Sequence, residues 1–212
     1  MRTRILPLDA READPRLVRE IAAVLLEDGI VAYPTETFYG LGAAALSPKA
    51  VSKVYGLKKR DSGKPLPLMV SGLDMAREIS ASLPRVFWGL AAEFWPGPLT
   101  LVVKASLSLP GFLTGLGGSV AMRVPPAAWI RRLVDEIRQP LTATSANISG
   151  RNELSDPRDV EAQFSGRIAL IVDGGPTPGG APSTIVDLTS GSPRVLRVGV
   201  IAAEEILALP GD

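Results

Sequence analysis

The chain has 212 residues, a net charge of +1 at pH 7 and 46% hydrophobic residues, enough apolar content for a sizeable buried core. It contains no cysteine and no histidine, which excludes disulfides, thiolate or imidazole metal sites and Ser–His nucleophile pairs. Any chemistry must therefore use Lys, Arg, Ser, Thr, Asn and carboxylates. The balanced charge also argues against a globally basic nucleic-acid-binding protein.

In chain order, the first half is predicted to form a helix over 15–28, a strand over 30–33, a helix over 48–56, a strand over 66–70, a helix over 84–95 and a strand over 99–103. A strand over 120–122, a helix over 126–138, a strand over 141–144 and a helix over 157–164 follow. The last predicted elements are strands over 168–172, 184–188 and 195–198 and a helix over 202–209. Pro67 suits an edge strand. This mixed alternation predicts an α/β fold of the α+β type, with an open mixed sheet flanked by helices. We expect one domain over residues 1–212, because no repeat or low-complexity linker appears.

The N-terminal segment is basic, but Pro7 and Asp9 interrupt its apolar stretch, so we expect no signal peptide. No apolar run is long enough to span a bilayer. We therefore expect a cytoplasmic protein without membrane association.

Two polar segments, 33–42 and 141–147, follow short apolar runs and concentrate small hydroxyl residues. Their backbone N–H groups and short side chains suit phosphate oxygens or an amino-acid carboxylate. Thr35, Ser145 and Asn147 equally fit turn and capping roles, which are the more frequent ones for these residue types. The Gly- and Pro-rich segment 174–182 is expected to be a mobile active-site loop.

The densest run of basic residues lies between Lys49 and Lys64. Part of it fits a solvated helix face. Lys58 and Arg60 are expected past a helix end at Gly56, in a loop where two cations can converge on a polyphosphate. No known nucleotide-binding signature is present, so an ATP site must be of another type.

Three carboxylates, Glu36, Asp173 and Asp187, are candidate magnesium partners or bases, but we interpret each as a loop anchor. The three tryptophans fall at apolar helical positions and are predicted to be core residues.

Several ordered segments together resemble the YrdC-like family, the threonylcarbamoyl-adenylate synthases of tRNA modification. They are 33–42 (Tyr-Pro-Thr-Glu-Thr-Phe-Tyr-Gly-Leu-Gly), Lys58-x-Arg60, 95–100 (Trp-Pro-Gly-Pro-Leu-Thr), 123–125 (Arg-Val-Pro), Ser145-x-Asn147 and 183–187 (Ser-Thr-Ile-Val-Asp). The resemblance runs from about Leu8 to Ile201. It implies a single domain with a mixed, twisted sheet around a positively charged concave cleft.

The resemblance also implies a nucleotidyltransferase reaction. L-threonine, bicarbonate and ATP would give L-threonylcarbamoyladenylate and pyrophosphate, with Mg²⁺ bound mainly through the ATP phosphates and no metal held by the protein alone. The product would serve N6-threonylcarbamoylation of adenosine 37 in ANN-decoding tRNAs. A separate threonylcarbamoyl-transferase system would complete the transfer, and a tRNA contact is a further implied partner.

Carried onto matching positions, the resemblance assigns catalysis and triphosphate binding to Lys58 and Arg60. The residues assigned to L-threonine are Thr35, Arg123, Ala143 and Ser183, and Arg123 could instead take a phosphate. The further residues assigned to ATP are Ser119, Ser145, Asn147, Ser155 and Arg197. We expect Lys58→Ala and Arg60→Ala to lose turnover while the protein still folds.

Two departures from the family pattern stand out. Met69 takes the place where many longer relatives carry a histidine, and the chain ends near the close of the shared domain, as in a short, single-domain form. Two alternative functions stay open. One is a non-catalytic module that binds tRNA or double-stranded RNA by its phosphates, and the other is a carbamoyl-phosphate-using relative of the same fold.

Overall fold

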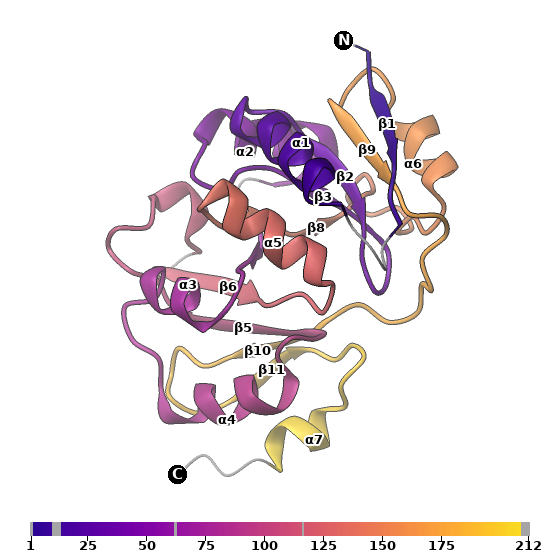
Figure 1. The fold of residues 1–212 in the computed structure, drawn as a ribbon. Helices are drawn as coiled ribbons and strands as arrows, with labels where there is room; N and C mark the ends of the chain where they lie inside the picture. Colours follow the sequence, from indigo (N-terminus) through magenta and orange to yellow (C-terminus); the bar gives the residue numbers. More distant parts are fainter. Residues whose placement is uncertain (1, 10–13, 62, 116, 209–212) are drawn as a thin grey trace.

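The computed structural model describes residues 2–9, 14–61, 63–115 and 117–208, whose strands form two mixed sheets. Sheet A has the strand order β1 (Arg4–Pro7), β9 (Leu170–Asp173), β2 (Val31–Pro34), β3 (Tyr39–Gly42) and β8 (Thr144–Ser145). Sheet B has the order β11 (Arg194–Arg197), β10 (Thr184–Asp187), β5 (Leu99–Lys104), β6 (Ser119–Arg123), β4 (Leu68–Met69) and β7 (Leu141–Thr142). The two sheets lie toward opposite ends of the molecule in Figure 1.

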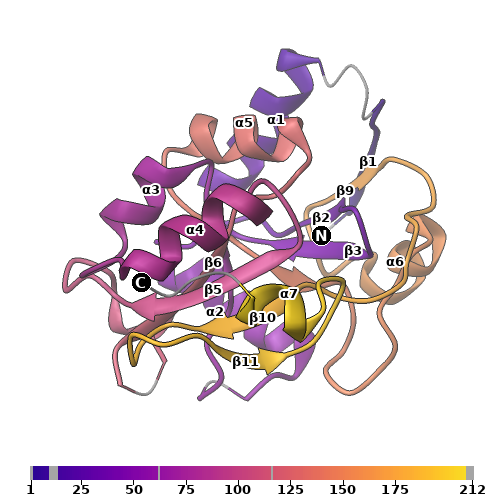
Figure 2. The same ribbon diagram turned by 90° about the horizontal axis from the view of Figure 1, so that it is seen from below.

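Both sheets combine parallel and antiparallel pairs. In sheet A, β9 is parallel to both β1 and β2, whereas β3 is antiparallel to β2 and β8. In sheet B, β10 is parallel to β5 and antiparallel to β11, which forms the outer edge seen in Figure 2. The predicted mixed α/β fold is therefore confirmed, with its strands divided between two sheets.

One residue, Ala143, separates β7 of sheet B from β8 of sheet A. The junction is reinforced by an isolated bridge between Ala44 and Leu141 and by a hydrogen bond from Thr142 N to Ala43 O at 2.9 Å. The predicted continuous strand over 141–144 is thus wrong, because the chain passes from one sheet to the other inside it.

The helices are α1 (Pro15–Leu26), α2 (Pro48–Lys58), α3 (Leu73–Glu78), α4 (Arg85–Phe94), α5 (Ala128–Ile137), α6 (Pro157–Phe164) and α7 (Ala203–Leu207), with a 3₁₀ turn at Gly111–Leu113. Helices α1, α2 and α6 begin in the same way: Asp14, Ser47 and Asp156 each accept a backbone N–H through the side chain and precede a proline. The predicted end at Leu209 lies outside the described residues.

Helices cover both faces of the sheets. Val31 and Tyr33 of β2 pack with α1 and α5 in one apolar layer, whereas the intervening Ala32 faces a second layer that includes α2, α4, α6 and α7. Trp129 of α5 is buried in the first layer, and Trp88 and Trp95 pack partly buried against the second. No helix in the described ranges has the length and apolar character needed to cross a membrane.

Other expectations are corrected. The strand predicted over 66–70 shrinks to Leu68–Met69, and it lies between β6 and β7 instead of at an edge, with Pro67 just outside it. Gly56 lies inside α2, so Lys58 is the last helical residue and only Lys59, in a left-handed conformation, caps the helix. β1, β3 and α3 lie outside the elements predicted from the sequence.

Candidate functional site

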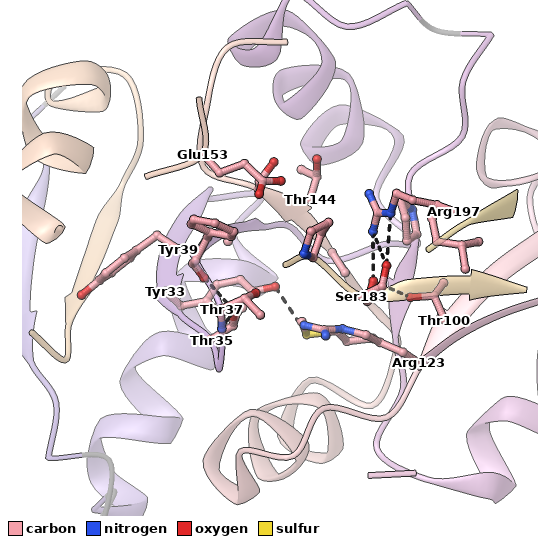
Figure 3. A pocket seen from close by; sticks show the side chains of 18 of the residues that line it. Tyr33, Thr35, Thr37, Tyr39, Thr100, Arg123, Thr144, Glu153, Ser183 and Arg197 are labelled. Carbon is pink, nitrogen blue, oxygen red and sulfur yellow. Dashed lines mark hydrogen bonds between the residues drawn. The ribbon is translucent and has the colours of Figure 1, made fainter. Parts of the chain in front are cut away.

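A cavity opens where the two sheets meet (Figure 3). Sheet A contributes residues of the turn between β2 and β3. The crossover, the segment where the chain passes from β7 of sheet B to β8 of sheet A, contributes Ala143, Thr144 and Ser145. Sheet B contributes Arg123 from the end of β6 and Arg197 from the end of β11. Residues distant in sequence therefore share one cavity because their strands end at the junction.

The turn between β2 and β3 is held by Thr35. Its Oγ1 accepts from Thr37 N at 3.2 Å and donates to Phe38 O at 2.6 Å, and Thr35 N also donates to Phe38 O at 3.2 Å. All three residues line the cavity. Thr35 thus fixes the turn and also lines the cavity, so its interpretation as a turn residue is compatible with its interpretation as a binding residue.

Tyr33 forms part of the cavity floor, and its ring lies across two glycines of β3. A Cβ placed on Gly42 would come within 2.7 Å of Tyr33 Cε1, and one on Gly40 within 3.0 Å of Tyr33 Cζ. The hydroxyl lies 3.3 Å from Thr142 O and 3.5 Å from Met69 Sδ, so its one proton is shared between two acceptors. Burial raises the pKa of Tyr33 well above its ordinary value, so the phenol stays protonated.

Arg123 faces the cavity from β6 and is paired with Glu36 of the turn between β2 and β3. Arg123 Nη1 lies 2.5 Å from Glu36 Oε1, and the two side chains are 9% and 23% exposed. The pair joins the two sheets across the junction. Glu36 therefore anchors its loop, as interpreted from the sequence, and Glu36 Oε2 is buried with no hydrogen-bond partner among the described residues.

Lys58 lies beneath the cavity and is only 2% exposed. Its ammonium donates to Ser145 O at 2.5 Å, Asn147 O at 2.8 Å and Asn147 Oδ1 at 2.8 Å. Burial, followed by the nearby charge of Arg60, lowers the pKa of Lys58 to about 8. Lys58 thereby organises the segment after β8 that brings Ser145 to the cavity wall.

Two further arginines line the cavity with their N–H groups on neutral oxygens. Arg60 donates to Lys64 O at 3.0 Å and to Pro65 O at 3.1 Å. Arg197 donates from Nη2 to Ser183 O at 2.8 Å and to Ser183 Oγ at 3.1 Å, contacts visible in Figure 3. Desolvation lowers the pKa of Arg197, but a guanidinium stays charged at any physiological pH.

The segment 174–182 joins β9 of sheet A to β10 of sheet B and runs past the cavity. Tyr39 Oη donates to Gly175 O at 2.8 Å and accepts from Gly174 N at 3.3 Å, and Gly179 N donates to Thr37 O at 2.7 Å. Its last residue, Pro182, lines the cavity. The expected mobility of this segment stays a prediction.

The structure brings most of the sequence-predicted site residues to the cavity wall: Thr35, Arg60, Arg123, Ala143, Ser145, Ser183 and Arg197. Four others lie outside the wall: Lys58, Ser119, Asn147 and Ser155. Lys58 and Asn147 contact each other directly beneath Ser145. Ser119 begins β6, and Ser155 accepts from Thr177 N through its carbonyl oxygen at 2.8 Å.

Several lining residues were not assigned from the sequence, among them Tyr33, Tyr39, Thr100, Thr144 and Glu153. The two tyrosines belong to the 33–42 segment already singled out, so motif membership could have found them. Thr100, whose Oγ1 lies 3.0 Å from Ser183 Oγ, ends the 95–100 segment and could have been found in the same way. Nothing local marks Glu153, the one carboxylate among the described lining residues.

The fold and the site define an α/β protein with an open cavity at the junction of two mixed sheets, whose three guanidinium groups and several hydroxyls are donors suited to anionic groups. The chain belongs to the Sua5/YciO/YrdC family, because the model of that family, described as telomere recombination, matches residues 23–199.

Two curated relatives from Pyrococcus abyssi (strain GE5 / Orsay) and Bacillus subtilis (strain 168), each named threonylcarbamoyl-AMP synthase, are 38% identical over 195 and 200 residues, covering 92% and 93% of this chain. The chain spans 57% of the length of either relative. The crystal structure of P. abyssi Sua5 complexed with L-threonine matches with a TM-score of 0.89 and 34% identity, over 98% of this chain and 61% of that one.

Proposed function

We propose that this chain synthesises L-threonylcarbamoyladenylate from L-threonine, bicarbonate and ATP with release of pyrophosphate, the first step of N6-threonylcarbamoyladenosine formation in tRNA. The observation that carries the proposal is the likeness to a relative complexed with L-threonine over 98% of this chain, together with a cavity whose wall holds Thr35, Arg123, Ala143 and Ser183. The names of the two curated relatives support the same reaction.

In this proposal the amino acid occupies the Arg123 end of the cavity. The guanidinium of Arg123, held by Glu36 through Nη1, has further N–H donors that suit a carboxylate. Thr35 and Ser183 place hydroxyl groups on two sides of the same cavity, and Ala143 offers backbone groups at the crossover. These contacts would orient the amino group for carbamate formation.

The triphosphate would lie toward Arg60 and Arg197, with Lys58 organising the neighbouring segment. A carbamate oxygen forms a bond to the α-phosphorus, the bond from that phosphorus to the bridging oxygen breaks, and pyrophosphate leaves with the electron pair. The attacking carbamate is already anionic, so the step needs alignment and charge neutralisation more than a strong base. This agrees with a chain that lacks histidine.

The donor set fits a magnesium ion carried by the nucleotide. The described residues contain no group of three or more His, Cys, Asp or Glu side chains able to hold a metal ion. Mg²⁺ commonly binds one carboxylate together with substrate phosphates, and Glu153 is the carboxylate at the cavity wall. When bound, Mg²⁺ would supply charge neutralisation at the phosphates.

The product would be a mixed anhydride, which is a reactive acyl donor, so a transferase must consume it promptly in the cytoplasm where we place this reaction. Direct tRNA contact by this chain is a separate part of the proposal. Salt-dependent RNA binding without ATP turnover would instead favour the RNA-binding module.

The test is pyrophosphate release by purified protein with ATP and Mg²⁺, with L-threonine and bicarbonate added separately and together. Release that requires both additions supports the synthase. Release with carbamoyl phosphate in place of bicarbonate and threonine would favour the carbamoyl-phosphate-using relative, and no release from protein shown to be folded by circular dichroism would contradict the synthase.

A further inference from the structure

Four cations lie at or beneath the cavity, and they differ in their partners. Arg123 has a carboxylate, that of Glu36, within ion-pairing distance at 2.5 Å. Among the residues that the structure describes, Arg60, Arg197 and Lys58 have none, and their N–H groups meet neutral oxygens. The cavity is therefore unevenly charged: one arginine is neutralised and the other cations are not.

Glu36 and Arg123 form an ion pair in which, among the described residues, each is the other's ion-pair partner. Glu36 Oε1 receives Arg123 Nη1, and Glu36 Oε2 is buried with no hydrogen-bond partner among the described residues. Both side chains are largely shielded from water, which keeps their mutual attraction strong and limits screening by salt. The charge of Arg123 is therefore largely balanced by that of Glu36, although it is still near enough to Arg197 to help lower the pKa of that guanidinium.

The opposite holds around Arg197 and Lys58. Glu153 is near enough to favour the charged form of both, yet it forms no ion pair with either in the described part of the chain. Figure 3 shows Glu153 and Thr144 at one end of the cavity and Arg123 at the other. The three cations Arg60, Arg197 and Lys58 outnumber Glu153, the carboxylate beside them, so this part of the cavity is positive.

We propose that Glu36 is a specificity-determining residue that assigns the two substrates to their ends of the cavity, an inference that rests on the proposed function. An amino acid is a zwitterion and suits the neutralised Arg123 end, where its carboxylate meets the guanidinium and its overall charge is zero. A polyphosphate is strongly anionic and is attracted to the unpaired cations. Without the Glu36 charge, Arg123 would become a third unpaired guanidinium and would bind phosphate in the place of the amino acid.

The experiment measures L-threonine binding by calorimetry with and without inorganic pyrophosphate, in the absence of ATP, for the wild type, Glu36→Gln and Glu153→Gln. Glutamine keeps the shape and an acceptor oxygen for Arg123 but removes the charge. In the wild type, pyrophosphate should leave the Kd for threonine unchanged. In Glu36→Gln, pyrophosphate should compete and raise that Kd by about tenfold, equivalent to 1.4 kcal/mol.

Glu153→Gln is the matched control, because it makes the same substitution at the carboxylate of the cavity wall, which forms no ion pair with a cavity cation in the described part of the chain. We expect it to bind pyrophosphate more tightly without producing competition against threonine. A merely structural role of Glu36 would weaken threonine binding equally with and without pyrophosphate, and that result would overturn the proposal. Competition already present in the wild type would overturn it as well.

If Glu36→Gln does not fold, Glu36→Asp keeps the charge but withdraws it by one methylene, and it should show weaker competition than the tenfold effect yet more than the wild type. Absence of any competition in that variant would contradict the inference. Failure of the wild type to bind threonine at all would contradict the proposed function itself, so the two failures are distinguishable.

Discussion

The ammonium group of Lys58 donates to both the backbone oxygen and the side-chain Oδ1 of Asn147, each at 2.8 Å. Lys58→Met should leave acceptors of this buried segment unsatisfied, so we expect the free energy of unfolding to fall by about 1–3 kcal/mol and turnover to fall with it. Urea denaturation measures the first effect. Lys59→Met, at the exposed neighbouring position, is the control and should stay within about 0.5 kcal/mol of wild type. A Lys58→Met protein of unchanged stability would support the sequence-based expectation that folding survives this loss.

The lowered pKa of Lys58 predicts a pH-dependent stability. Its pKa is about 8 in the folded protein and returns to 10.5 in the unfolded chain. Between these values the unfolded chain binds a proton that the folded chain has released, so stability should rise with pH, by up to about 1.4 kcal/mol per unit. The difference between wild type and Lys58→Met, measured from pH 7 to 10, isolates this effect from that of the tyrosines, whose raised pKa values act in the opposite direction. A difference that does not change with pH would contradict the shift.

Conservative replacements should separate the two ends of the cavity. Lysine keeps the positive charge of arginine but lacks its planar set of donors. The Arg123→Lys variant therefore still presents a positive charge to Glu36. We expect Arg123→Lys to raise KM for threonine and Arg60→Lys to raise KM for ATP, each by roughly 10- to 100-fold. Steady-state pyrophosphate release with each substrate varied in turn measures this. If both variants raise the same KM, the assignment of the two ends fails.

The close approach of Tyr33 to β3 makes Gly42 sensitive to substitution. A Cβ there would lie 2.7 Å from Tyr33 Cε1 and 3.0 Å from Leu141 Cδ1, both in the buried core, so Gly42→Ala should cost about 1–3 kcal/mol. Gly56→Ala is the matched control, because that position in α2 has no neighbouring atom within 4 Å and alanine should stabilise the helix by about 0.5–1 kcal/mol. Thermal or urea unfolding of both variants checks that Gly42→Ala lowers the free energy of unfolding and that Gly56→Ala raises it.

The hydroxyl of Tyr39 should restrain the 174–182 segment. Burial raises the pKa of Tyr39 to about 12, which keeps the hydroxyl able to donate to Gly175 O. Tyr39→Phe should cost about 0.5–1.5 kcal/mol and should speed amide hydrogen exchange at Gly174. Tyr55→Phe removes a hydroxyl bound to Lys64 O outside this segment and serves as the control. Unchanged exchange at Gly174 in Tyr39→Phe would show that other contacts hold the segment.

The sequence predicted the elements whose signals are local. The helix expected over 157–164 coincides with α6, because Asp156, Pro157 and the apolar spacing are all contained within one segment. β3 lies within the segment 33–42, whose small hydroxyl residues predict a polar loop, and its Gly40 and Gly42 disfavour an isolated strand. It forms because β2 and β8 supply hydrogen-bonding partners on its two sides, and no local pattern encodes that pairing.

The site residues likewise divide into those that a local motif indicates and those whose contacts depend on how the two sheets are arranged. Arg123 and Ser183 could be placed in it by their motifs, whereas the pairing of Glu36 with Arg123 depends on how sheet A is set against sheet B. Gly56 predicts a helix end before Lys58, but this glycine has open space around it and lies within α2, so Lys58 is helical.

The place of β9 between β1 and β2 has a consequence during synthesis on the ribosome. Arg4–Pro7 (β1) pairs with Leu170–Asp173 (β9). Among the described strands, β1 is therefore synthesised first but has no strand partner until β9 has been synthesised. Arg197, which completes the cavity wall, is translated later still. A nascent or prematurely released chain would therefore hold no partly working site, and it would expose an unpaired strand for quality-control factors to recognise.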